Sequence, residues 1–208
     1  MVAPCEPAVV AIQPKERPPF RRKVVVIDPG HGGGDLGTQS TTKPRYKEKH
    51  LNLSTSKMLE GFLQQMGYQT VMTRTDDTFL TLEKRAEIAN GLKCDLFISV
   101  HYNSAPAKQA EGVEVFFYRD DKDKDRATSS KALAQLVLNK VIENTEAKSR
   151  GVKHGDLSVI RNTKMPAILV EGGFLTNDDE MQRLKDPNYL KRVAWGIAQG
   201  IHAYLSKN

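Results

Sequence analysis

The sequence predicts a three-layer α/β/α domain around a mostly parallel or mixed central sheet of about six strands. Short, largely apolar runs alternate along the chain with segments whose apolar residues recur at helical spacing. Residues 24–27 and 96–100 are two such runs, and they suit strands that are buried on both faces. Strands that alternate with amphipathic helices are typical of a sheet covered by helices.

Six segments have the composition of strands. Residues 113–118 alternate between apolar and polar side chains, which predicts a strand nearer to an edge of the sheet. The charged segment 120–126 (DDKDKDR) is expected to be only a loop. The six predicted strands are residues 24–27, 69–73, 96–100, 113–118, 158–160 and 167–170.

Five segments have the apolar spacing of amphipathic helices. Gly67 is a natural stop for the first helix. Asn177 and Glu180 resemble a capping box for a short fourth helix. The predicted helices are residues 51–66, residues 82–92, a segment from Ser129 or Ser130 to about Val141, the short helix after Asn177, and residues 190–205.

The chain of 208 residues is expected to form one domain preceded by a tail. Residues 1–22 contain five prolines and several basic side chains, so we expect a flexible Pro-rich basic tail there and the folded domain over residues 23–208. No apolar run approaches the roughly 18 residues that span a membrane. The apolar patch at residues 8–12 is too short for a signal peptide, so we expect any targeting segment to have been removed.

The net charge of +6 indicates affinity for anionic polymers or surfaces, although a solvated lysine-rich face is the simpler explanation. No zinc-finger spacing or aromatic-and-basic RNA motif is present, so nucleic acid is not expected as a partner. Cys5 and Cys94 are too few for a disulfide framework. Cys94 precedes a buried strand and is expected to be a small core residue.

Polar residues follow three of the predicted strands. His31 lies in a Gly-rich loop after the first strand, and His101 and Glu171 come directly after two later strands. Glu48 adds a carboxylate at the start of the first helix. Ligands of open α/β sheets bind outside the carboxyl ends of the strands. Two histidines and a carboxylate form a common catalytic zinc set, and a further glutamate could serve as general base.

Each of these residues also has a structural explanation when it is taken alone. Glu48 could be only a first-turn carboxylate that the helix dipole favours, and a single histidine is more often a hydrogen-bonded structural residue. His50 would point to a different side of the helix, and His202 lies on the polar side of the last helix. The convergence of two histidines and a glutamate at three strand ends is hard to explain as packing, which favours a catalytic site.

Several segments, in order from about residue 24 to the C-terminus, resemble the amidase-3 family, the zinc-dependent N-acetylmuramoyl-L-alanine amidases of the AmiA/AmiB/AmiC type. The resemblance extends far beyond a single motif. One departure is His50, where the family usually carries an acidic residue, but this leaves the ligand set intact. The matching segments are IDPGHGG (27–33), EKHLNL (48–53), TRTD (73–76), LEKR (82–85) with AN (89–90), SVHYNS (99–104), GVEV (112–115) and MPAILVEGGFLTN (165–177).

The resemblance implies that residues 23–208 are an amidase catalytic domain. Its reaction would be hydrolysis of the amide bond between N-acetylmuramic acid and the L-alanine of the peptidoglycan stem peptide, in cell-wall remodelling or daughter-cell separation. The resemblance further implies one Zn²⁺ ion held by His31, Glu48 and His101, with Glu171 as the catalytic glutamate. Arg74 could equally form a structural ion pair. The further candidates for substrate contacts are Asn103, Arg74 and His154.

The resemblance also implies a monomeric periplasmic or extracellular protein, associated with the cell wall, whose partner is peptidoglycan. Some members carry a long insertion after the strand that matches residues 113–118, and a helix in it plugs the zinc site until an activator displaces it. Residues 119–126 are too few for such a helix with its connections, because each turn takes 3.6 residues. We therefore expect an open site that does not require an activator protein.

Two other functions compete with this interpretation. A zinc peptidase that cuts within the stem peptide would use the same metal chemistry, and mass spectrometry of the products would distinguish it from an amidase. A non-catalytic wall-binding module would need neither an open zinc site nor Glu171.

Overall fold

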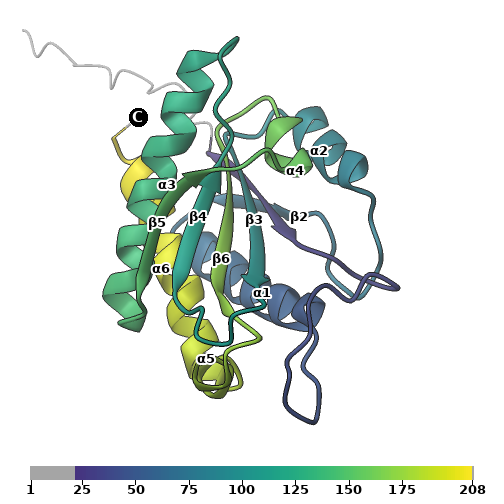
Figure 1. The fold of residues 1–208 in the computed structure, drawn as a ribbon. Coiled ribbons are helices and arrows are strands. Elements are labelled where there is room, and N and C mark those ends of the chain that lie inside the picture. Colours follow the sequence, from purple (N-terminus) through teal and green to yellow (C-terminus); the bar gives the residue numbers. More distant parts are fainter. Residues whose placement is uncertain (1–21, 208) are drawn as a thin grey trace, which may run out of the picture.

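The computed structural model, which describes residues 22–207, contains a six-stranded sheet with helices on both faces (Figure 1). The predicted α/β/α fold is confirmed. The predicted tail at residues 1–22 lies outside the described residues, apart from Arg22. Within the part of the chain that is described, no helix is both long enough and apolar enough to cross a bilayer.

The sheet is mixed, with four parallel strands beside a reversed pair. In their order across the sheet, the strands are β2 (Gln69–Met72), β1 (Val24–Pro29), β3 (Leu96–Asn103), β6 (Ala167–Phe174), β4 (Val113–Phe117) and β5 (Ser149–His154). The first four run parallel, β4 runs antiparallel to β6, and β5 runs parallel to β4. The carboxyl ends of β1, β3 and β6 therefore meet at one edge, whereas β4 and β5 end at the opposite edge.

Helices cover both faces of the sheet, which explains why most of its strands are apolar runs. The helices are α1 (Glu48–Gln65), α2 (Leu82–Gly91), α3 (Lys124–Thr145), α4 (Ser158–Arg161), α5 (Asp178–Leu184) and α6 (Pro187–Leu205). The long helices α1, α3 and α6 cover one face, where Leu59, Val137 and Ile197 are buried in one core. The shorter α2 and α4 cover the other face, around Phe97 and Ile160.

Strand β4 is the neighbour of the edge strand β5, close to the edge as its alternating sequence predicted. The cause of the alternation is different from the one expected, because Glu114 is buried. Its carboxylate accepts hydrogen bonds from the side chains of Asn103, Arg150 and Lys153. A buried and fully paired charge thus produces the same sequence pattern as a solvent-exposed position.

Three elements differ from the prediction. Residues 158–160 form helix α4 and not a strand, because so short an apolar run does not distinguish a strand from a helical turn. The sixth strand is β5, a largely polar edge strand whose sequence SRGVKH carries no clear strand signal. Helix α3 begins earlier than predicted, at Lys124, because the side chain of Asp123 accepts a hydrogen bond from the backbone of Arg126.

Helices α3 and α6 pack closely because α6 carries glycine where it faces α3. A Cβ atom on Gly200 would overlap the backbone of Val137, and one on Gly196 would lie 2.6 Å from the Cα of Val141. Gly61 of α1 differs, because an added Cβ would have no atom within 4 Å beyond its own helix and neighbours.

We predict that Gly200→Ala lowers the free energy of unfolding by about 1–3 kcal/mol, because the new methyl group forces α6 away from α3. The matched control Gly61→Ala should raise it by about 0.5–1 kcal/mol, because alanine favours the helix and meets no obstacle. Urea unfolding measures both variants. Equal stability of the two variants would contradict this account of the α3–α6 contact.

Candidate metal and catalytic site

Three side chains that could hold a metal ion converge at the edge where β1, β3 and β6 end. One ligand atom from each of His31, Glu48 and His101 lies within 4.8 Å of the others. The two oxygens of Glu48 separate the histidines, with Oε2 3.1 Å from Nε2 of His31 and Oε1 2.9 Å from Nδ1 of His101. The structure thus brings together the three predicted ligands, which come from a loop, a helix and a strand.

The loop after β1 holds His31 in an unusual backbone conformation, with φ of 60°. Its Nδ1 atom lies 2.8 Å from Oδ2 of Asp35, which leaves Nε2 directed towards Glu48. A carboxylate partner of this kind fixes the ring orientation and raises the basicity of a metal-binding histidine. Gly37 follows with φ of 63°, and a Cβ there would lie 2.5 Å from Oε2 of Glu48. The glycines of this loop therefore leave space for the ligand side chains.

Glu48 is the first residue of α1 and is almost fully buried. Its carboxylate accepts hydrogen bonds from the backbone N–H groups of Thr38 and Tyr102, at 2.9 and 3.2 Å. Burial opposes its ionisation, but hydrogen bonds and charge from His101 and His31 outweigh burial and hold the pKa of Glu48 well below its usual range. The pKa of His31 is raised: burial lowers it, but the Glu48 and Asp35 carboxylates outweigh that effect.

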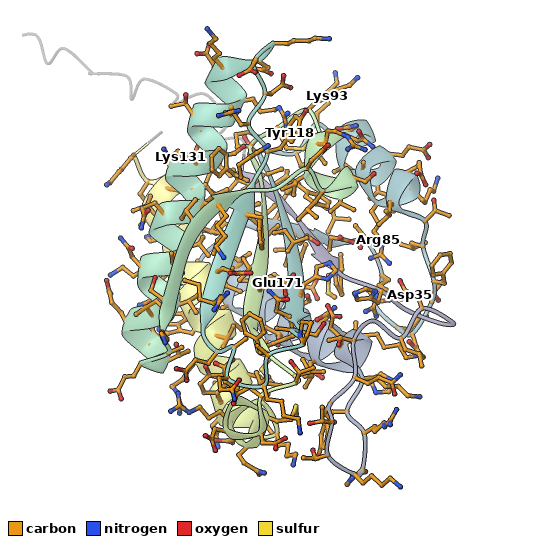
Figure 2. All side chains as sticks on the ribbon, viewed as in Figure 1. Asp35, Arg85, Lys93, Tyr118, Lys131 and Glu171 are labelled. Atoms are coloured by element: carbon orange, nitrogen blue, oxygen red, sulfur yellow. The ribbon has the colours of Figure 1, made fainter. Side chains whose placement is uncertain are left out.

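A buried network lies beneath residues 30–37, the loop that carries His31, which we call the metal loop. The Asp28 carboxylate is fully buried and accepts hydrogen bonds from Thr73, Arg85 and Ser99, at 2.6, 2.9 and 2.8 Å. The Arg85 guanidinium also donates to the carbonyl oxygens of Pro29 and His31, both at 2.7 Å. Figure 2 shows Arg85 beside the loop that carries Asp35.

Arg74 belongs to this support. It is 4% exposed, and its guanidinium donates to the carbonyl oxygens of Pro29, Gly30 and Lys49. Among the described residues, hydrogen bonds to backbone carbonyl oxygens and no ion pair hold its guanidinium, so the structural ion pair considered from the sequence is not found.

Glu171 lies next to the candidate metal ligands, on β6. It is the register partner of His101 on the parallel strand β3, so both side chains lie on the same face of the sheet. Its Oε2 atom is buried and has no hydrogen-bond partner among the described residues. Burial, with the charges of Glu48 and Glu114, raises the pKa of Glu171 well above its usual range. Figure 2 shows Glu171 near the centre of the sheet.

The two remaining candidates for substrate contacts have different positions. Asn103 is partly exposed at the end of β3, where its side chain donates to Glu114 at 2.7 Å. His154 ends β5, level with Phe117 and therefore with Ile168 of β6, towards the edge opposite the metal ligands. Its Nδ1 accepts a hydrogen bond from the backbone of Arg119. The structure does not bring His154 to the site, because β4 and β5 are reversed relative to β6.

Sequence reasoning missed Asp35 and Glu114. Asp35 follows the glycines of the metal loop, and its spacing of four residues from His31 was an available signal. Glu114 lies in the GVEV segment that matches the family, but its pairing could not be predicted, because its cationic partners Arg150 and Lys153 lie on a strand that the sequence did not predict.

A family model described as N-acetylmuramoyl-L-alanine amidase matches residues 25–203. The probable cell wall amidase LytH of Staphylococcus aureus is 33% identical over 198 residues, which are 95% of this chain and 64% of that protein. The chain thus spans less than two thirds of that relative's length.

Solved structures agree with the family match. An N-acetylmuramoyl-L-alanine amidase from Clostridium difficile 630 is 39% identical with a TM-score of 0.84, over 90% of this chain and 98% of that one. The CwlD amidase from Clostridioides difficile, solved in complex with the GerS lipoprotein, is 28% identical with a TM-score of 0.83, over 90% of this chain and 100% of that one. Because the family model covers most of its length, the chain belongs to the N-acetylmuramoyl-L-alanine amidase family.

Proposed function

We propose that this chain hydrolyses the amide bond between N-acetylmuramic acid and the L-alanine of the peptidoglycan stem peptide. The observation that carries the proposal is the convergence of His31, Glu48 and His101 beside the carboxylate of Glu171, whose Oε2 atom is buried. Membership of the amidase family supports the choice of bond. A wall-binding module would have no use for a proton-accepting group next to a metal-binding cluster.

A single zinc ion is the metal that we propose for this site, with His31, Glu48 and His101 as its ligands. The donor set supports zinc, because two imidazole nitrogens and one carboxylate leave one coordination position open. The carboxylate of Glu48 lies within hydrogen-bond distance of both imidazole rings, so all three side chains could bind one cation in place of these contacts. When bound, zinc supplies a Lewis acid that activates water and polarises a carbonyl group.

Glu171 is the proton carrier in this proposal. Its unpaired Oε2 can accept a proton from the attacking water and later deliver it to the nitrogen of the leaving L-alanine. The carbon–oxygen bond forms in the first step and the carbon–nitrogen bond breaks in the second, which leaves a carboxyl group on the lactyl arm and an amine on the peptide.

Asn103 remains our proposed substrate contact, since it is partly exposed two residues after His101. Arg74 and His154 are not included, because of the positions described above. We propose that residues 23–208 form the catalytic domain and that the protein acts in the cell wall, outside the cytoplasmic membrane. A role in wall remodelling or daughter-cell separation follows from the substrate.

We also propose that the chain is active as a monomer without a partner protein. Residues 118–123 alone connect β4 to α3, which leaves no space for an inserted helix over the site at this point of the fold. The GerS complex of CwlD makes the partner requirement an important point to test.

We expect one zinc ion per chain in the purified protein after dialysis, measured by atomic emission. His101→Ala should lose most of its zinc, because one of three ligands is absent. His202→Ala is the matched control and should keep its zinc, since His202 lies near the end of α6, where its ring contacts Tyr68 and not the metal-binding cluster. Full zinc occupancy in His101→Ala would remove His101 from the ligand set.

We expect the chain alone to release intact stem peptides with a free L-alanine amino group from purified peptidoglycan, as read by mass spectrometry. Glu171→Gln should keep its zinc but lower the rate about 10²–10⁴-fold, because glutamine cannot accept the proton. Glu87→Gln, at an exposed position of α2, is the control.

Shortened peptides that remain attached to the glycan would identify a peptidase instead. Near-normal turnover by Glu171→Gln would move proton transfer to another group. Activity that appears only when a second protein is added would contradict the independence of the site.

A further inference from the structure

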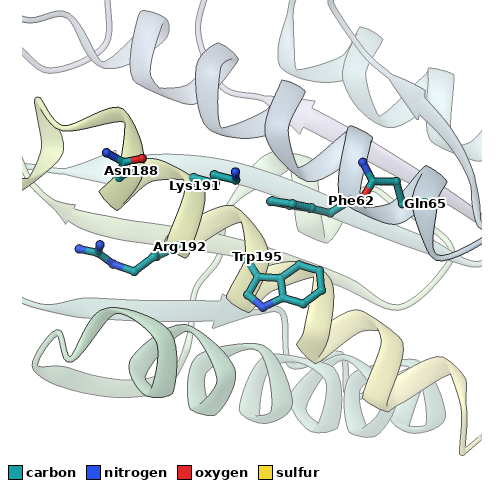
Figure 3. A pocket seen from close by; sticks show the side chains of 6 residues that line it. All are labelled: Phe62, Gln65, Asn188, Lys191, Arg192 and Trp195. Atoms are coloured by element: carbon teal, nitrogen blue, oxygen red, sulfur yellow. The ribbon is translucent and has the colours of Figure 1, made fainter.

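A groove of about 460 Å³ lies between α1 and α6, outside the catalytic site. Its size is within the range of about 300–1,000 Å³ that is usual for ligand sites. Phe62 and Gln65 of α1 form one wall, and residues of α6 form the other (Figure 3). The residues from α6 are Asn188, Lys191, Arg192 and Trp195. Their spacing of three, four and seven residues from Asn188 places them along one side of the helix.

The groove has an aromatic pair, Phe62 and Trp195, and a cationic end. The rings of Phe62 and Trp195 are 5.0 Å apart and meet edge to face at 65°. Figure 3 shows Lys191 and Arg192 to one side of this pair. No acidic residue lines the groove, and neither cation forms a salt bridge with any residue that the structure describes. The guanidinium of Arg192 lies over the Tyr189 ring, and this contact leaves its charge uncompensated.

This combination of groups indicates an anionic sugar polymer. The apolar face of a sugar ring can lie on an aromatic side chain, and the amides of Gln65 and Asn188 can bond with hydroxyl and acetamido groups. Lysine and arginine bind carboxylates through charge-assisted hydrogen bonds. A membrane surface fits less well, because membrane-binding helices present a projecting apolar face, whereas these rings line a groove.

We propose that this groove binds glycan strands that have lost their stem peptides and carry free lactyl carboxylates. The proposal rests on the proposed function, since hydrolysis of the muramoyl amide leaves one carboxylate on the sugar. Intact peptidoglycan has an uncharged amide at that position. A groove that contacts the sugar rings would therefore find a carboxylate directly on the ring substituent only where the reaction has already taken place.

The groove and the catalytic site would contact different parts of one strand. Phe62 lies roughly 21 Å along α1 from Glu48, at a rise of 1.5 Å per residue. A strand held in the groove would keep the enzyme close to uncut amides nearby, which raises their effective concentration. The groove is thus a retention site and takes no part in the chemistry.

Binding of the full chain to defined glycan strands tests this proposal. The probe is soluble glycan whose stem peptides have been removed, and its control is the same glycan with the lactyl carboxylates converted to neutral amides. Loss of the charge–charge contacts in Lys191→Ala/Arg192→Ala should weaken binding to the carboxylated probe about tenfold or more. Trp195→Leu, which keeps an apolar contact with Phe62, should also weaken it.

The control variant Lys124→Ala/Lys131→Ala removes the same charge from the exposed side of α3, where Figure 2 shows Lys131. It should bind as the original chain does. All variants should cleave a small soluble muramoyl-peptide at the original rate. A loss of glycan binding at the groove is therefore distinguishable from a loss of the proposed amidase activity. Urea unfolding verifies that each variant is folded.

Equal binding of carboxylated and neutral strands would overturn the proposal, as would equal weakening by the two double variants. Adsorption to vesicles that contain anionic lipid, lost only in Lys191→Ala/Arg192→Ala, would assign the groove to a membrane surface instead. If no variant and not even the original chain cleaves muramoyl-peptides, the proposed function is wrong, whether or not glycan strands bind to the groove.

Discussion

The buried carboxylate of Asp28 ties the metal loop to the core of the sheet. It lies at the end of β1 and accepts hydrogen bonds from Thr73, after β2, and from Ser99 on β3. Its third partner, Arg85 of α2, extends the network to the backbone of the loop that carries His31. A buried charge is tolerable only when it is paired and hydrogen-bonded. The strand ends and the loop are therefore held in one arrangement.

The same arrangement determines how the ligands meet. Parallel strands bring His31 and His101 to one edge, and the helix that follows the loop begins with Glu48. Gly30 allows the His101 ring to pass directly over the backbone, because a Cβ there would overlap that ring. The convergence of the candidate ligands thus depends on close packing of backbone against side chains.

Much of this could be predicted from the sequence because the signals are local. Buried parallel strands are continuous apolar runs, and His31, Glu48, His101 and Glu171 come after such runs or at a helix start, towards the sheet edge where ligands bind. The missing parts depend on tertiary contacts. Strand β5 is polar and is held by its pairing with β4, and Arg74 gains its role only from carbonyl groups of segments distant in sequence. The α1–α6 groove likewise joins residues of two helices that no local pattern connects.

The zinc affinity of Arg85→Lys tests most directly whether the buried network positions the metal site. Lysine keeps a cation beside Asp28 but cannot reach the carbonyl oxygens of Pro29 and His31 at the same time, so the fold is retained while the loop loses its support. Competition with a chelator should show zinc binding about 10–100-fold weaker, with Lys84→Arg on the exposed side of α2 unchanged. Zinc affinity equal to that of the original chain, in a folded Arg85→Lys protein, would contradict this account.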